Sequence, residues 1–141
     1  MSLSEFELIK KFFNQSVISR QDTSISIGDD AAIINIQPDH HTVSTLTQWV
    51  EGNDYSRNEP GFDTGQNLLF HALRDFNLQY TNASWMTLSI SLKSNDEDWL
   101  TQFSQGLLLS AKEKNIQLIG GDTSRGPEGL RLHIIGSEKM A

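Results

Sequence analysis

Residues 85–92 place the strongest constraint on the fold of this chain. Apolar side chains occupy the even-numbered positions from Met86 to Leu92, and Thr or Ser occupies the positions between them. Because the side chains of a strand point alternately to its two faces, this period of two predicts a β-strand with one buried and one polar face. Such a strand is stable only when another layer covers its apolar face.

The segment that follows predicts this covering layer. Ser94 and Glu97 have the spacing of a helix capping box, and acidic residues fill the first turn. Apolar residues then recur at helical spacing from Trp99 to Ala111. We therefore expect a helix that runs to about Lys114.

Further elements are predicted on both sides of this pair. Helical periodicity is present in residues 4–14 and 64–78, and patterns that favour strands occupy residues 31–36, 42–50, 116–119 and 130–134. We expect Gly120 to Thr123 to form a turn at the end of a strand. Because helices and strands do not alternate regularly, the pattern predicts an α+β fold. It would hold a mixed or antiparallel sheet of about four to five strands, with about three helices packed on one face.

Composition narrows the class of protein. The chain has 141 residues, enough for one domain or part of one, and a formal net charge of −7. An acidic chain binds nucleic acid and anionic membranes poorly, so we expect neither as a partner. No cysteine is present, which excludes disulfides, thiolate zinc sites and cysteine nucleophiles. No apolar run approaches the roughly 20 residues of a membrane-spanning helix, and we expect a cytoplasmic protein.

Acidic residues stand at unusual places in the predicted fold. Asp29 and Asp30 follow a glycine at a turn, Asp75 lies near the buried side of a helix, and Asp122 follows two glycines at the end of a strand. Carboxylates brought together repel one another unless a cation compensates them. Magnesium prefers such oxygen ligands and commonly shares them with substrate phosphates. If these acids converge, they predict a magnesium site, and Gly121 would let backbone amides approach a phosphate.

Each of these features also has a purely structural explanation. Glycine followed by aspartate is common in plain turns, because glycine permits positive φ and aspartate bonds its own backbone. Asp75 would then be a solvated helix acid, or one that pairs with Arg74. No Walker loop, dinucleotide glycine fingerprint or nucleophile elbow is present. The residues alone leave two hypotheses open: a metal site, or an acidic interaction module whose acids lie far apart.

Five short segments are informative together because of their order along the chain. They are EFELI from Glu5, IGDDAA at residues 27–32, VEG at residues 50–52, LRD at residues 73–75 and LIGGDTSRGP at residues 118–127. Together they resemble the N-terminal domain of thiamine-monophosphate kinase, within the larger group related to aminoimidazole ribonucleotide synthetase. The last segment is the most specific, and the resemblance covers nearly the whole chain.

The resemblance implies transfer of a phosphoryl group from ATP to the phosphate of thiamine monophosphate, which gives thiamine diphosphate. The acceptor oxygen is already largely ionised near neutral pH, so no protein base has to remove a proton. Positioning and charge neutralisation would carry most of the catalysis. ATP is therefore the expected cosubstrate and magnesium the expected cofactor, and no residue is assigned as a catalytic acid or base.

The resemblance also assigns roles to side chains and a partner to the chain. The expected magnesium ligands are Asp30, Asp75, Asp122 and, on a strand, Thr45. Gly121 and Asp122 would approach the ATP phosphates, and Asp54 stands where the family binds its substrate. Family members are homodimers whose N-terminal strands form a shared barrel, so we expect dimerisation to complete the sheet.

The chain departs from the family at two of these places. Thr47 replaces an expected magnesium carboxylate of the strand, and Asp54 replaces a histidine, which puts a negative charge where a phosphate-bearing substrate would bind. Residues 1–141 are expected to form a single N-terminal domain that binds ATP and magnesium, without the family's C-terminal domain. Two hypotheses follow: the N-terminal half of the kinase, or a divergent, non-catalytic member that keeps the dimer scaffold and residual metal or nucleotide binding.

Overall fold

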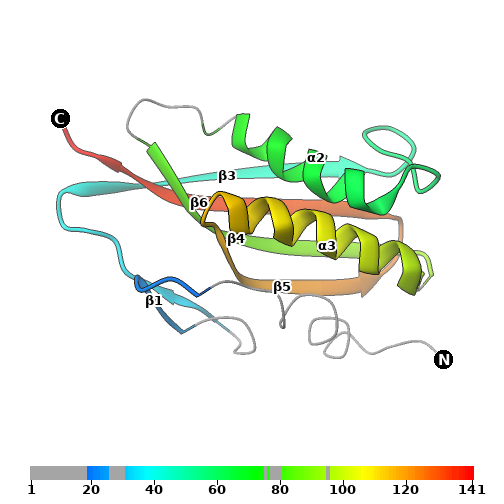
Figure 1. The fold of residues 1–141 in the computed structure, drawn as a ribbon, viewed down its shortest axis with the longest axis horizontal. Helices are drawn as coiled ribbons and strands as arrows, with labels where there is room; N and C mark the ends of the chain where they lie inside the picture. Colours follow the sequence, from blue (N-terminus) through cyan, green and yellow to red (C-terminus); the bar gives the residue numbers. More distant parts are fainter. Residues whose placement is uncertain (1–18, 26–30, 75, 77–80, 95) are drawn as a thin grey trace.

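The computed structural model describes residues 19–25, 31–74, 76, 81–94 and 96–141 (Figure 1). Within these ranges the order of elements is β1 (Thr23–Ile25), β2 (Ile33–Ile34), β3 (His40–Val50), α2 (Gly61–Arg74), β4 (Thr81–Leu92), α3 (Glu97–Glu113), β5 (Gln117–Arg125) and β6 (Gly129–Lys139). The helix predicted over residues 4–14 lies outside the described residues, as do Asp30 and Asp75.

The larger sheet holds four strands in the order β3-β6-β4-β5. Strand β6 pairs antiparallel with both β3 and β4, whereas β4 and β5 run parallel. Parallel neighbours need a crossover connection, and α3 provides it between β4 and β5. The expectation of an α+β fold with a mixed sheet of four to five strands is therefore confirmed.

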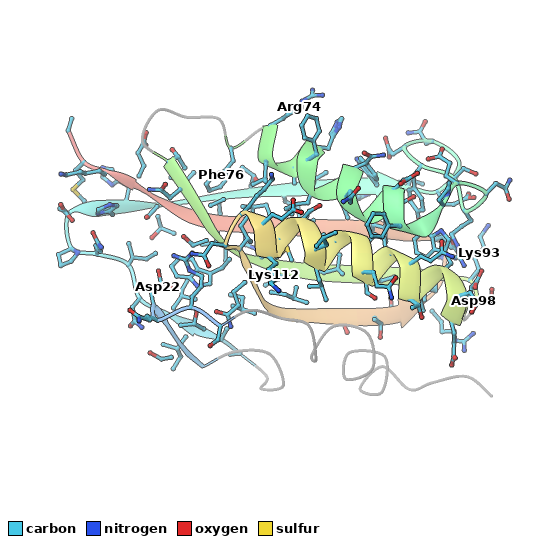
Figure 2. All side chains as sticks on the ribbon, in the orientation of Figure 1. Asp22, Arg74, Phe76, Lys93, Asp98 and Lys112 are labelled. Carbon is cyan, nitrogen blue, oxygen red and sulfur yellow. The ribbon has the colours of Figure 1, made fainter. Side chains whose placement is uncertain are left out.

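Helices α2 and α3 lie side by side on one face of this sheet (Figure 1). The alternation that predicted β4 is confirmed, because the apolar side chains at even positions from Met86 to Leu92 are at most 4% exposed. They form one core with helix residues such as Leu68 and Phe103. Figure 2 shows the side chains of the described residues on the same ribbon. Neither helix of the described chain is both long and apolar enough to cross a membrane.

Glycines let the two helices approach at backbone distance. Gly61 and Gly65 of α2 and Gly106 of α3 all lie at the contact. A Cβ atom at position 61 would stand 2.6 Å from the carbonyl oxygen of Trp99, and one at position 106 would overlap the carbonyl group of Phe62. The packing of α2 on α3 therefore depends on the absence of side chains at these positions.

The turn expected at Gly120 to Thr123 was wrong. These residues belong to β5, where Gly121 pairs with Leu88 of β4 and Asp122 pairs with Ser89. A side chain at position 121 would meet the carbonyl oxygen of Leu88 at 2.6 Å. The glycine is thus needed for close pairing with β4, and a neighbouring strand rather than a local turn decides its conformation.

Two other local details differ from expectation. The N-cap of α3 is Asp96, whose side chain accepts a hydrogen bond from the backbone N–H of Trp99 at 3.1 Å. Ser94 stands before this position and does not cap the helix, although its spacing to an acid fits a capping box. Strand β1 lies in a polar stretch for which no strand was predicted. It pairs antiparallel, in a separate sheet, with β2, which falls inside the strand predicted over residues 31–36.

The sheet face opposite to the helices is covered at one end by the segment around β1. The indole N–H of Trp85 donates a hydrogen bond to Thr23 Oγ1 at 2.9 Å, and the guanidinium of Arg20 lies 5.5 Å from the ring centroid. Trp85 is only 1% exposed as a result. The central part of this face carries the polar side chains of the sheet.

Candidate functional site

A cavity of about 360 Å³ lies on the sheet face opposite to the helices. All four strands line it, through Leu46, Thr87, Leu88, Ser89, Gly121, Asp122, Arg131 and His133. The polar members alternate with core residues along their strands, so the periodicity that buries one face also builds the cavity on the other. Its volume falls within the range of small-ligand sites.

Strand register brings Asp122 and Arg131 onto one row of this cavity. Arg131 pairs with Gln48 on one side and with Ser89 on the other, and Ser89 pairs with Asp122. Asp122 and Arg131 are therefore two strands apart, about 10 Å between Cα atoms. No ion pair joins them to each other or to another described residue. Both charges thus line the cavity without a compensating partner in the described part of the chain.

Arg131 and His133 are two ionisable residues of the cavity that were not predicted as site residues from the sequence. A signal was present, because both stand between the apolar residues of the strand predicted at 130–134 and so share its polar face. That signal gives no position relative to Asp122. Only the insertion of β6 between β3 and β4 places Arg131 near Asp122, and Gly121 and Asp122 lie in this same cavity.

Thr45, the magnesium ligand expected on a strand, lies far from Asp122. Strands β3 and β5 form opposite edges of the sheet, so at least three strand spacings, about 14 Å, separate the two residues. Thr45 also shares the helix-facing side of β3 with the buried Thr47. The two expected ligands therefore cannot hold one ion within this chain. Because Asp30 and Asp75 lie outside the described residues, the ligand set stays a prediction; the described residues contain no group of three or more metal-binding side chains.

The hydroxyl groups of Thr45 and Thr47 provide a test of whether the chain suits magnesium. Both Oγ1 atoms are buried and have no hydrogen-bond partner among the described residues. A buried hydroxyl without a partner costs free energy, and oxygen donors are the ligands that magnesium takes. The donor chemistry on this side of β3 therefore fits magnesium, with two neutral oxygens that need a carboxylate from another segment.

Asp54, the expected substrate-binding residue, caps the turn that follows β3. Its Oδ2 atom accepts a hydrogen bond from the backbone N–H of Val50 at 2.8 Å. The same turn requires a left-handed backbone at Gly52, where φ is 85°. Asp54 remains exposed to solvent, so a contact with a substrate stays a prediction.

A partly buried ion-pair cluster, which no sequence motif indicated, adjoins this turn. The guanidinium of Arg57 pairs with Glu128, pairs with Asp96 at 3.2 Å and lies 4.5 Å from the centroid of the Trp99 ring. Burial, followed by the nearby Glu128 carboxylate, raises the pKa of Tyr55 above its ordinary value. These contacts tie the connection between β3 and α2 to the start of α3 and to the turn before β6.

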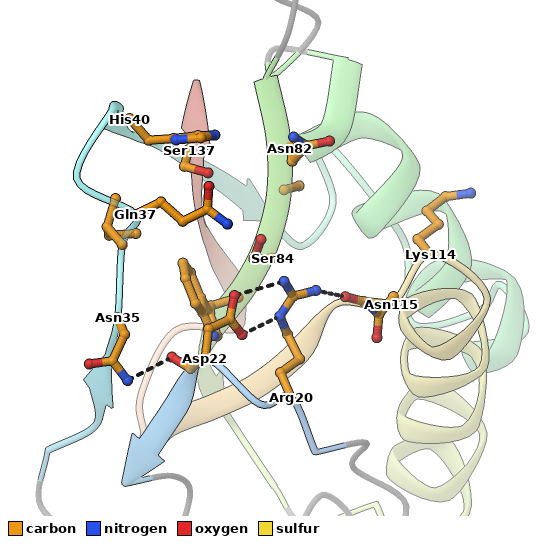
Figure 3. A pocket seen from close by; sticks show the side chains of 13 residues that line it. Arg20, Asp22, Asn35, Gln37, His40, Asn82, Ser84, Lys114, Asn115 and Ser137 are labelled. Carbon is orange, nitrogen blue, oxygen red and sulfur yellow. Dashed lines mark hydrogen bonds and ion pairs between the residues drawn. The ribbon is translucent and has the colours of Figure 1, made fainter. Parts of the chain in front are cut away.

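A second cavity, of about 330 Å³, lies beside β1, the start of β4 and the end of α3 (Figure 3). Arg20 donates from Nε and Nη2 to the two carboxylate oxygens of Asp22, at 2.8 and 2.9 Å, and from Nη1 to the carbonyl oxygen of Asn115 at 2.7 Å. The hydrogen bond from Arg20 lowers the pKa of Asp22. Because the charges of Arg20 and Asp22 compensate each other, this pair is less available to an ionic ligand than Asp122 and Arg131 are.

Comparison with known proteins gives a family match and close relatives. Residues 28–137 match the family described as AIR synthase related protein, N-terminal domain. The chain is 36% identical over 141 residues to the thiamine-monophosphate kinase of Escherichia coli strain K12, a match that covers 99% of this chain and 43% of that protein. The chain spans less than half the length of the curated relatives it matches, 38% and 43% for two of them.

Solved structures agree with this match. The crystal structure of thiamine-monophosphate kinase from Stenotrophomonas maltophilia K279a is similar with a TM-score of 0.82 and 34% identity, over 99% of this chain and 44% of that one. AaThiL complexed with AMPPCP and TMP is similar with a TM-score of 0.69, over 94% of this chain and 40% of that one. At 18% identity, the second likeness shows the fold alone.

Proposed function

Because the chain belongs to the family of AIR synthase related proteins through their N-terminal domain, we propose that it is the ATP- and magnesium-binding part of a thiamine-monophosphate kinase. Residues 1–141 would act as a single N-terminal domain, and a C-terminal domain would supply the rest of the active site. The relatives that carry this activity in their names support the proposal. The complex of AaThiL with AMPPCP and TMP supports ATP and thiamine monophosphate as the two substrates.

The proposed reaction moves the γ-phosphoryl group of ATP to a phosphate oxygen of thiamine monophosphate. A bond forms between that oxygen and the γ-phosphorus, the bond between the γ-phosphorus and the β–γ bridging oxygen breaks, and ADP leaves. The second pKa of a phosphate monoester is about 6, so the acceptor is largely ionised at neutral pH. The protein therefore has to align two anions, and it needs no general base.

The position of Asp122 is the observation that carries this proposal. Its carboxylate lines a cavity of ligand size without an ion-pair partner among the described residues, and it follows Gly121 in the segment that most specifically resembles the kinase. In the proposed site Asp122 holds magnesium, and the backbone at Gly121 leaves room for the ATP phosphates. Bound magnesium would neutralise part of the phosphate charge.

The remaining residues act at the other parts of the proposed site. Thr45 would hold a further magnesium ion together with Asp30 and Asp75, which the unpartnered Thr45 hydroxyl supports. Asp54 would contact the acceptor substrate from the turn after β3.

A homodimer is part of the proposal. Strand β3 is an edge of the sheet, so the backbone groups along its outer side have no partner strand in the larger sheet. Pairing with a second copy would extend the sheet and give these backbone groups hydrogen-bond partners. Light scattering coupled to size exclusion tests this point: a particle of the 15.8 kDa chain mass at micromolar concentration contradicts the dimer.

Isothermal titration with AMPPCP and magnesium tests nucleotide binding. The unsubstituted chain should bind, and Asp122→Asn should remove most of the magnesium-dependent affinity. Asp98→Asn is the matched control, because Asp98 is an exposed acid at the start of α3 and does not line the cavity. Failure of the unsubstituted chain to bind would contradict the proposed nucleotide site. Chromatographic detection of thiamine diphosphate from ATP and thiamine monophosphate then tests transfer itself.

A further inference from the structure

Arg131 is the arginine of the cavity that also holds Asp122. It lies on β6, an inner strand bonded on both sides, so its place on the sheet is firmly set. Its Nε atom donates a hydrogen bond to Gln48 Oε1 at 3.2 Å. Among the described residues, none accepts a hydrogen bond from its two terminal nitrogens. The outer edge of the guanidinium, with its parallel N–H donors, is therefore available to a ligand.

The spacing between Arg131 and Asp122 is too large for direct pairing and suits a bridging ligand. The two Cα atoms are about 10 Å apart, and only the short side chain of Ser89 stands between them in the row. A metal-bound phosphate carries positive charge at the metal and negative charge at its oxygens. Such a ligand can meet the carboxylate through the metal and the guanidinium through the oxygens at the same time.

We propose that Arg131 binds the phosphate chain of ATP in this cavity. The inference rests on the proposed function, and it assigns different parts of the ligand to two residues. Asp122 meets the metal, and Arg131 meets phosphate oxygens directly. Because a guanidinium presents two parallel N–H donors to a phosphate, lysine is a weaker substitute at this position.

Inorganic tripolyphosphate is the probe, because it carries the phosphate chain of ATP without adenosine. The 141-residue chain is titrated with it by calorimetry at constant ionic strength, with and without magnesium. Arg131→Gln should weaken binding about tenfold or more in both conditions, as expected for loss of a charge-assisted hydrogen bond. Asp122→Asn should weaken binding only when magnesium is present. This difference between the two variants is one that general loss of structure would not produce.

Two further variants control for charge and for folding. Arg125→Gln removes the same charge from an exposed residue of β5 that does not line the cavity, and it should change affinity by no more than about twofold. Arg131→Lys keeps the aliphatic stem on the sheet, so it should remain folded and recover part of the affinity.

Three outcomes overturn the inference. Equal losses of tripolyphosphate affinity in Arg131→Gln and Arg125→Gln would mean that only the overall electrostatic field of the chain attracts the anion. AMPPCP binding that depends on Asp122 but not on Arg131 would refute the role of Arg131 and leave the proposed nucleotide site intact. If neither tripolyphosphate nor AMPPCP binds the unsubstituted chain, the inference and nucleotide binding by this chain both fail.

Discussion

Replacement of Gly106 by alanine should destabilise the fold, although alanine is the better helix former. At an exposed position in a helix interior, replacing glycine by alanine would raise the stability of the fold by about 1 kcal/mol. Gly106 instead contacts α2, where the added Cβ atom would overlap the carbonyl oxygen of Phe62 and lie 2.9 Å from its carbon. Carbon atoms ordinarily meet at about 3.5 Å or more, so the two helices would have to separate by at least about 0.6 Å.

This separation affects the whole contact between α2 and α3. Gly61 and Gly65 bring the same two backbones together, so the helices cannot move apart at one glycine alone. Overpacking typically costs about 1–3 kcal/mol, and we expect the upper part of that range here because backbone atoms are involved. After the gain in helix propensity, the net loss should be about 2 kcal/mol. For a chain of this length, that corresponds to a fall in Tm of about 4–8 °C.

Urea unfolding followed by tryptophan fluorescence and circular dichroism measures this loss. The midpoint should fall while the m-value stays unchanged. Gln105→Ala is the matched control, because Gln105 is exposed on the same helix and its replacement should leave stability equal or slightly higher. A Gly106→Ala chain that is as stable as the unsubstituted one would refute the close-packing argument, since propensity alone would then decide the outcome.

Three polar contacts yield further predictions, each measured by urea unfolding. Asp96→Ala should lower the free energy of unfolding by about 1 kcal/mol, because Asp96 caps α3, while Asp96→Asn keeps the cap; equal losses would contradict this role. Arg57→Gln should lower the free energy of unfolding by about 3–5 kcal/mol, because it leaves the buried Glu128 carboxylate without its counterion. Adding Glu128→Gln to this variant should restore part of the lost stability. If the two substitutions instead lower stability additively, the ion pair does not contribute. The hydrogen bond from Arg20 lowers the pKa of Asp22 in the folded chain. The pair therefore stabilises the fold fully at pH values above the unfolded pKa of about 3.9. This stabilisation is lost as pH falls through the lower pKa of the folded state. The stability difference between the unsubstituted chain and Asp22→Asn should therefore close as pH falls below about 4, and a constant difference would contradict the assignment.

The best predictions from sequence concern elements whose pattern is local. Strand β4 and helix α3 were predicted because residues 85–92 alternate and because residues 99–111 repeat at helical spacing. Each pattern follows from the geometry of one element and needs no knowledge of its neighbours. The buried faces were predicted for the same reason.

The prediction failed where a distant partner decides the conformation. Gly120 to Thr123 have the composition of a turn, yet pairing with β4 extends them into β5. Prediction of the candidate site from sequence was limited for the same reason. Gly121 and Asp122 could be singled out from their motif, whereas Arg131 became a candidate only through its neighbours.

The sequence by itself determined the elements whose pattern is local, such as β4 and α3, and which of their faces are buried, because side-chain periodicity is a property of one element. The tertiary structure decided which strands are neighbours. Gln48, Arg131, Ser89 and Asp122 are distant along the chain, and they form one row only because β6 lies between β3 and β4. Strand pairing joins residues far apart in sequence through backbone hydrogen bonds that every residue can make, so local side-chain patterns do not specify it.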